Sequence, residues 1–398
     1  MTTAEGVVFG PSVTIEIESE IRRVVDRQAQ RVAGLGSAAS HAWERASECL
    51  LGGKLLRPRL LMGAFDALAP VEFQEVLAEV GSPRSGSGLP LTALRDTALP
   101  NGAAAREQAL RIAAAVELLH FAFLLHDDII DGDLMRRGRP NFIGLQLRDG
   151  DAAVGGVETG RASLASQLHA ARSSAMLVGD LLLSAAHQII FSEALPVGLG
   201  IRLQQQLDRT VVESVSGELT DVALSAGHVD AELVDVVEMS RQKTATYSFE
   251  LPLRSAAILA GLGPDVEDTL GQVGAQLGLA YQLQDDLLST FGRADEHGKD
   301  AFSDLREGKE TAIIAIARRT GAWPYIAPHF GAGDLSTADG AKVRSLLSEC
   351  GAEREVRALI DELAANVREL IATEPDVIGP DMAGLIDDLI DTLNGRRS

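Results

Sequence analysis

An apolar stretch that runs directly into three carboxylates constrains this chain more than any other feature. It spans residues 120–131 and ends in His126-Asp127-Asp128-Ile129-Ile130-Asp131. Residues four apart on a helix lie above one another, so Asp127 and Asp131 face the same way, about 6 Å apart along the axis. Two carboxylates this close repel unless a cation lies between them, and Mg²⁺ prefers such oxygen ligands. The stretch therefore predicts a long helix whose end binds metal, with Asp128 beside the pair.

A second acidic stretch lies at residues 281–289, which read Tyr-Gln-Leu-Gln-Asp-Asp-Leu-Leu-Ser. Gln282, Asp285 and Ser289 share one helical face by the same spacing. One acidic turn is more often a solvated helix end, but two copies that each follow an apolar run favour metal binding. We expect two acidic helices that face each other and hold several Mg²⁺ ions.

The composition favours helices. The chain has 398 residues, of which 46% are hydrophobic and only 4% aromatic. That length supports a large core, and the pattern shows helical spacing without strand alternation. We therefore expect an all-α fold and one large helical domain over residues 1–398. Residues 1–12 are expected to be disordered, and Gly- and Pro-rich sequence predicts loops at about 80–102 and 142–168.

The net charge limits the kinds of partner that the chain can bind, and the cysteine content indicates its compartment. The formal net charge is −21, which disfavours nucleic acid and anionic lipid as partners. We see no signal peptide and no uncharged apolar run of about 20 residues, so we expect no membrane span. Two cysteines imply no disulfide framework and suit the cytoplasm. An anionic ligand such as a diphosphate would need a local basic patch.

Basic residues gather at several points along the chain. Residues 52–59 begin with two glycines and place Lys54 and Arg57 at the start of a helix, where phosphate binds well; a glycine turn with solvated bases is the alternative. Arginines also follow Asp131 directly. His120 lies on the Asp127 face, where a core histidine is the alternative. Gly274 and Gly278, on the Asp285 face, would either leave room for a ligand tail or allow tight helix packing.

In order and spacing, these motifs resemble the trans-isoprenyl diphosphate synthase family over about residues 50–315. The matching pieces are Gly-Gly-Lys…Arg-Pro at 52–58, Asp-Asp-x-x-Asp at 127–131 followed by Arg-Arg-Gly-Arg-Pro, Lys-Thr at 243–244, Gln-x-x-Asp-Asp at 282–286, and Gly-Lys with Ser-Asp-Leu-x-x-Gly-Lys at 298–309. The resemblance implies a single helical bundle of the isoprenoid synthase type with a central cavity, and a homodimer.

The resemblance also implies a role for each matching residue. The carboxylates would bind about three Mg²⁺ ions, and they are Asp127, Asp131 and Asp285, supported by Asp128 and Asp286. The residues that would hold the allylic diphosphate are Arg136, Lys243 and Lys299. The isopentenyl diphosphate site would comprise Lys54, Arg57, His120 and Arg137. Thr244 and Gln282 would line the reacting centre, and Lys309 would lie in a loop that closes over it.

The implied reaction is head-to-tail prenyl transfer. An allylic diphosphate ionises, isopentenyl diphosphate attacks the cation, and a proton is lost. In this family, bulky residues at the fourth and fifth positions before the first aspartate stop chain growth early; here these are Phe123, which is bulky, and Ala122, which is small. The small Ala122 and the glycines at 274 and 278 therefore favour a C20 product, geranylgeranyl diphosphate, with the C15 farnesyl product as the alternative.

Three positions depart from the family pattern. Ser289 stands where aspartate is common, which predicts weaker metal binding; Leu55 replaces a frequent arginine, and Glu218 a frequent glutamine. A terpene cyclase would share the fold and the first motif, but Lys54, Arg57 and His120 argue against it. A non-catalytic regulatory subunit is the other alternative, and the retained carboxylates argue against that.

Overall fold

Helices dominate the computed structural model, which describes residues 11–51, 53–68, 102–136, 138–153, 163–228, 232–292 and 302–395. The first half contains α1 (Pro11–Val32), α2 (Ser37–Leu50), α3 (Leu56–Leu68), α5 (Gly102–Ile130), α6 (Phe142–Ala153) and α7 (Leu164–Ser192). Two strands of two residues each, β1 (Met135–Arg136) and β2 (Arg139–Pro140), form an antiparallel pair. The prediction of an all-α fold is confirmed.

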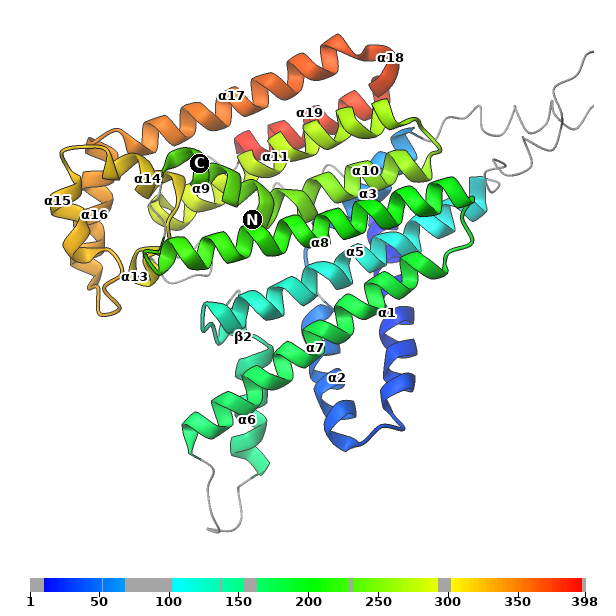
Figure 1. Ribbon diagram of the computed structural model, residues 1–398, viewed down its shortest axis with the longest axis horizontal. Coiled ribbons are helices and arrows are strands. Elements are labelled where there is room, and N and C mark those ends of the chain that lie inside the picture. The colour runs from blue at the N-terminus through cyan, green and yellow to red at the C-terminus, as the bar shows by residue number, and fades with distance from the viewer. Residues whose placement is uncertain are drawn as a thin grey trace, which may run out of the picture. The chain divides into compact units, whose positions relative to one another are not determined.

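The second half continues the helical pattern. It contains α8 (Val197–Ser225), α9 (Leu233–Ser240), a π-helix η3 (Arg241–Glu250), α10 (Leu251–Leu259), α11 (Pro264–Phe291), α13 (Ser303–Glu307) and α14 (Ala312–Arg318). Short turns α15 (Trp323–Ile326) and η4 (Ala327–His329) lead to α16 (Thr337–Glu349), α17 (Ala352–Thr373), α18 (Pro375–Ile378) and α19 (Pro380–Gly395). Figure 1 shows the path of the chain.

The helices group into two compact units. One unit contains Pro11–Arg59 and Leu110–Ala194, and the other contains Leu60–Ala109 and Leu195–Ser398. The first therefore carries the Asp127 motif and the second carries the Asp285 motif.

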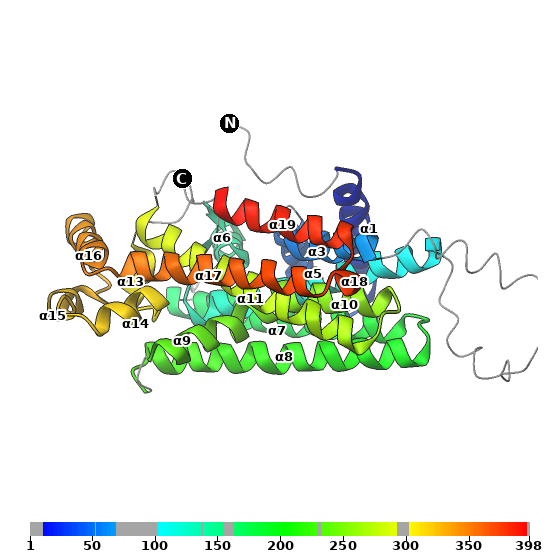
Figure 2. The same cartoon turned by 90° about the horizontal axis from the view of Figure 1, so that it is seen from above.

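The second unit is built around α11. This helix starts with Pro264 at its first position and with two acidic residues in its first turn, which suit a helix N-terminus. It packs against η3, α10 and α17, and α17 and α19 lie alongside it in both views (Figures 1 and 2). Leu277, Leu283 and Leu287 are buried on α11. A rigid central helix thus carries the second acidic motif.

In the first unit, the long helix predicted from about residue 103 to 131 is confirmed as α5. Ile112, Val116 and Leu119 are buried as the apolar stripe predicts, whereas Phe123 is only half-buried. In the same unit, α1 and α2 pack together, and α6 packs on α2 and α7. The first acidic motif therefore lies at the end of a helix with a buried body.

The expectation of a loop at 142–168 is wrong at both ends of that range. Residues 142–153 form α6, because Phe142 and Ile143 are buried and Asn141 accepts a hydrogen bond from the Gly144 N–H, as an N-cap does. The Ser163 side chain likewise caps α7 by accepting from the Ser166 N–H. Apolar anchors and caps outweigh the glycines and polar residues there. Residues 1–10, 69–101 and 154–162 lie outside the described residues.

Two helices meet the length and apolarity expected of a membrane span, in the residues that the structure describes. They are Ala104–Ile130 and Leu164–Ser192. The most apolar window of the first is 72% buried inside the protein and that of the second 44%. A core helix of a soluble protein meets the same criteria. The burial of α5 agrees with its being a core helix.

Candidate active site

The first acidic motif is held by an arginine. Asp127 is half-buried and Asp128 buried at the end of α5, and Asp131 is exposed in the turn that follows. Arg136, from β1, donates to Asp128 at 2.6 Å and to Asp127 at 3.3 Å. Burial raises the pKa of Asp128 to about 6, although Arg136 opposes the shift. The structure thus brings together one predicted diphosphate ligand and two predicted metal ligands.

A tight hairpin brings Arg136 back to the end of α5. Its strands pair Arg136 with Arg139, and Gly138 adopts a positive φ of 72° that glycine tolerates well. Asn141 donates to the Asp133 carbonyl, which ties the base of the hairpin together. Arg137, a predicted ligand of isopentenyl diphosphate, lies outside the described residues.

The other predicted ligands of isopentenyl diphosphate lie in the same unit. Lys54 is exposed just before α3, and Arg57 is half-buried in the first turn of that helix. Leu55 between them has a positive φ of 53° and a buried side chain, so the departure from arginine serves the core. His120 is buried on α5. Ala122 is fully buried on the same helix.

The second acidic motif contains one buried and one exposed carboxylate. Asp285 is exposed, whereas Asp286 is buried and accepts a hydrogen bond from Gln282 at 2.8 Å. Burial raises the pKa of Asp286 to about 7, against the opposing effect of Lys309. Neighbouring carboxylates, Asp304 first, raise the pKa of Lys309 despite its burial. Three of the predicted site residues therefore lie close enough to interact.

Ser289, which stands where aspartate is common in the family, has a carboxylate neighbour. Its hydroxyl donates to Asp304 at 2.5 Å. Asp304 is buried and belongs to the Ser-Asp-Leu-x-x-Gly-Lys motif that ends at Lys309. The carboxylate of Asp304 therefore lies beside Ser289 of the second acidic motif, although Asp304 comes from another helix. Lys299, predicted to bind diphosphate, lies outside the described residues.

Lys243 is paired with two carboxylates of α8. Its Nζ lies 3.0 Å from Glu218 and 2.6 Å from Asp221. Sequence reasoning assigned no role to Asp221 and left that of Glu218 open. Glu218 and Asp221 are three residues apart, which puts both on one helical face. This spacing is the feature of the sequence that could have indicated a shared basic partner. The other Asp221 oxygen is buried without a hydrogen-bond partner among the described residues.

The glycines of α11 serve helix packing. A Cβ added at Gly274 would come within 2.8 Å of the Glu250 backbone, and one added at Gly278 within 2.6 Å of Ala245. These glycines let η3 approach α11 closely. The interpretation that Gly274 and Gly278 leave room for a ligand tail is therefore wrong. These glycines consequently give no support to a C20 product.

No group of three or more His, Cys, Asp or Glu side chains converges as a ready-made metal site among the described residues. The motif carboxylates are instead engaged by cationic and amide side chains, as in the pairs Arg136–Asp128 and Gln282–Asp286. The donor set itself consists of carboxylate oxygens without thiols, which suits a hard cation. A cation would therefore compete with Arg136 for the first motif.

Comparison with known proteins identifies the family. The family model described as polyprenyl synthetase matches residues 41–323. The chain belongs to the polyprenyl synthetase family. The matched region includes both acidic motifs and every basic motif described above.

Several polyprenyl synthetases are similar to this chain. A (2E,6E)-farnesyl diphosphate synthase of Mycobacterium tuberculosis is 32% identical over 251 residues, which cover 61% of each protein. The chain thus spans about three fifths of that relative. A geranylfarnesyl diphosphate synthase of Aeropyrum pernix is 27% identical, over 72% of this chain and 83% of that one.

Solved structures support the same family. A geranylgeranyl pyrophosphate synthase from Corynebacterium glutamicum, crystallised with isoprenyl diphosphate and magnesium, matches with a TM-score of 0.77 at 27% identity. The match covers 96% of this chain and 98% of that one. The relatives make products of different length, so family membership leaves the product length of this polyprenyl synthetase open.

Proposed function

We propose that this polyprenyl synthetase condenses isopentenyl diphosphate with an allylic diphosphate (DMAPP, GPP or FPP) and that geranylgeranyl diphosphate is its main product. The proposed reaction class rests on one observation. Both acidic motifs and their accompanying basic residues lie inside the region that matches the family. The two units are proposed to work as one prenyltransferase domain.

The proposed chemistry follows from the residue types. Arg136 and Lys243, with Lys299, stabilise the negative charge that builds up on the departing diphosphate. Lys54, Arg57, Arg137 and His120 hold isopentenyl diphosphate, so that the reaction becomes effectively unimolecular. Thr244 and Gln282 place polar groups at the reacting centre. Apolar side chains exclude water, which would otherwise quench the allylic cation.

The proposed cofactor is Mg²⁺, as in the Corynebacterium glutamicum structure. Asp127, Asp128 and Asp131 would hold it in the first unit, and Asp285 and Asp286 in the second. Bound Mg²⁺ would offset the charge of the diphosphate as it leaves. Since Asp127 and Asp128 are paired with Arg136, they would have to exchange this partner for the metal.

The proposed C20 product rests on the two residues that precede the first motif. Ala122 is small and fully buried, and Phe123 lies one turn before Asp127 and is half-buried. Phe123 is thus proposed as the floor that ends growth at C20. Farnesyl diphosphate is the second candidate, because the Mycobacterium tuberculosis relative is a farnesyl diphosphate synthase.

Extraction of products tests this proposal. The purified chain is supplied with isopentenyl diphosphate and a C10 starter, and the products are separated by length. A dominant C20 product is expected, and a dominant C15 or C25 product would contradict it. Phe123→Ala should lengthen the product, because truncation removes the ring from the floor; an unchanged product spectrum would show that Phe123 is not the floor.

The partners and setting are also proposals. We infer a homodimer from an exposed apolar stripe on α8, whose members are Val212, Val215, Leu219 and Val222. Their spacing of three and four residues is typical of helix–helix contacts. Two unpaired cysteines support a reducing, cytoplasmic setting. The net charge of −21 supports the absence of nucleic acid as a partner.

A further inference from the structure

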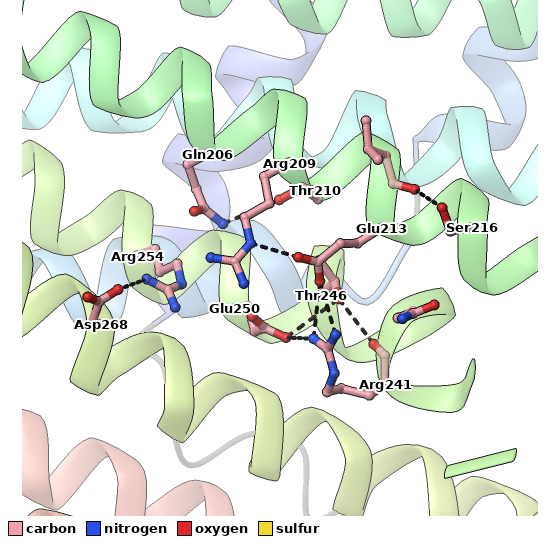
Figure 3. A network of polar contacts seen from close by, with 12 residues as sticks. Gln206, Arg209, Thr210, Glu213, Ser216, Arg241, Thr246, Glu250, Arg254 and Asp268 are labelled. Carbon is pink, nitrogen blue, oxygen red and sulfur yellow. Dashed lines mark hydrogen bonds and ion pairs between the residues drawn. The ribbon is translucent and has the colours of Figure 1, made fainter. Parts of the chain in front are cut away.

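Figure 3 shows a network of polar contacts around Arg241, Thr246 and Glu250 of η3. The same segment carries Lys243 and Thr244. The centre of the network is Arg241, the first residue of η3, which donates to Glu250, the last residue of η3, at 2.8 Å. Arg241 also donates to Glu213 of α8 at 3.2 Å and makes two bonds to Glu238 of α9. The guanidinium thus links both ends of the π-helix to each other and to α8.

The segment between Arg241 and Glu250 has an unusual geometry. At its end the Leu251 N–H donates to the carbonyl of Thr246, five residues earlier instead of the usual four. In addition, the Thr246 hydroxyl donates to the Arg241 carbonyl. π-Helices are rare, mostly limited to a single turn, and frequent at functional sites. A segment of ten residues therefore needs support from its surroundings.

Glycines allow two helices to press against this segment from their own sides. A Cβ added at Gly217 of α8 would overlap the backbone nitrogen of Lys243. Gly274 and Gly278 of α11 lie against Glu250 and Ala245 in the same way. These contacts hold η3 against α8 and α11. The bond between Arg241 and Glu250 adds a side-chain link between the two ends of η3, which are nine residues apart.

The burial of the network differs from one end to the other. The Glu250 side chain is only 4% exposed and that of Arg241 23%, whereas Glu238 is 49% exposed. Breaking a buried charge pair by removing one partner costs far more than breaking an exposed one. Glu213 also accepts from Arg209 at 2.7 Å, so the α8 side of the network is anchored as well.

We propose that Arg241 and Glu250 form a clasp that holds the π-helix in shape and thereby positions Lys243 for the allylic diphosphate. The clasp residues act through Lys243 and are positioning residues. The inference rests on the proposed function, because it needs Lys243 to bind the diphosphate. It adds Arg241 and Glu250, which none of the sequence motifs includes, although they lie on the same π-helix as Lys243.

A double-mutant cycle between Glu250 and Lys243 tests the clasp. Glu250→Gln keeps the shape of the side chain but removes the charge that Arg241 binds. It should lower kcat/KM for the allylic diphosphate about tenfold, since a small displacement of a charged ligand is costly. The KM for isopentenyl diphosphate should change less than about twofold, because its ligands lie elsewhere.

The second half of the cycle uses Lys243→Met, which keeps most of the aliphatic stem. In that background Glu250→Gln should have little further effect, because the residue through which it acts is gone. If Glu250→Gln lowers the allylic kcat/KM by the same factor in the wild type and in Lys243→Met, the clasp is contradicted. The proposed function is not affected by that result. If Lys243→Met itself leaves the allylic kcat/KM unchanged, the proposed function of Lys243 fails instead.

Two further variants control for simple loss of structure. Glu238→Gln removes an exposed carboxylate from the same arginine without spanning the π-helix, so it should leave both kinetic constants within about twofold of the wild type. Arg241→Lys keeps the charge but loses the forked geometry, so it should reproduce the selective loss of Glu250→Gln. An equal rise in the KM of both substrates for Arg241→Lys would contradict the clasp.

Discussion

At the scale of single residues, two bases of the candidate site are paired with carboxylates. Arg136 is paired with Asp127 and Asp128, and Lys243 with Glu218 and Asp221. A base held by carboxylates keeps its charge and its position, but a diphosphate must compete for it. Under the proposed function, these carboxylates would lower the affinity of each base for the diphosphate.

Glu218 offers a direct test of this competition, because the family often has glutamine there. Glu218→Gln should lower the KM for the allylic diphosphate by roughly fivefold, the factor that about 1 kcal/mol of released ion pairing represents. Steady-state kinetics at fixed isopentenyl diphosphate measures it. Glu362→Gln, an equal charge change at an exposed position of α17, is the control. A higher KM for Glu218→Gln would show that Glu218 assists binding instead.

At the scale of elements, the close approach of η3 and α11 depends on glycine. A methyl group at Gly278 would lie within 2.6 Å of Ala245, so the helices would have to separate. The spacing of Gly274 and Gly278 was visible in the sequence, but which element faced them was not, because a pattern of small residues does not name its partner.

Gly278→Ala should therefore destabilise the protein by about 1–3 kcal/mol, the usual cost of overpacking. Urea unfolding followed by circular dichroism measures the shift of the midpoint. Gly384→Ala in α19 is the matched control, because nothing lies within 4 Å of its added Cβ. That control should gain up to about 1 kcal/mol from helix propensity. A raised midpoint for both variants would show that η3 and α11 are not tightly packed.

At the scale of the whole molecule, the sequence predicted the helical class and the long helices that carry both acidic motifs, because their apolar stripes are long and regular. It missed α6, where short-range caps and two buried side chains outweigh a polar composition. It also missed the clasp and the pairing of Lys243 with Asp221, since contacts between residues distant in sequence leave no periodic signal. The placement of Asp304 beside Ser289 was hidden for the same reason.

The proposed dimer is a property of the whole molecule and can be tested without substrate. Leu219, on the apolar stripe of α8, is 66% exposed. Leu219→Asp should abolish dimerisation, because a buried, unpaired charge at a helix contact costs several kcal/mol. Sedimentation velocity measures the change. Leu35→Asp, at an equally exposed turn in the other unit, should stay dimeric; a dimeric Leu219→Asp would place the interface elsewhere.

The central claim is that carboxylates of the first acidic motif support metal-dependent prenyl transfer, and Asp127→Asn tests it most directly. Incorporation of labelled isopentenyl diphosphate into products is measured with and without a chelator of divalent cations, with Asp334→Asn, at an exposed turn, as the control. We expect Asp127→Asn to lower turnover about a hundredfold or more, and the chelator to abolish turnover in the wild type. Turnover near that of the wild type, or activity that survives the chelator, would contradict the account.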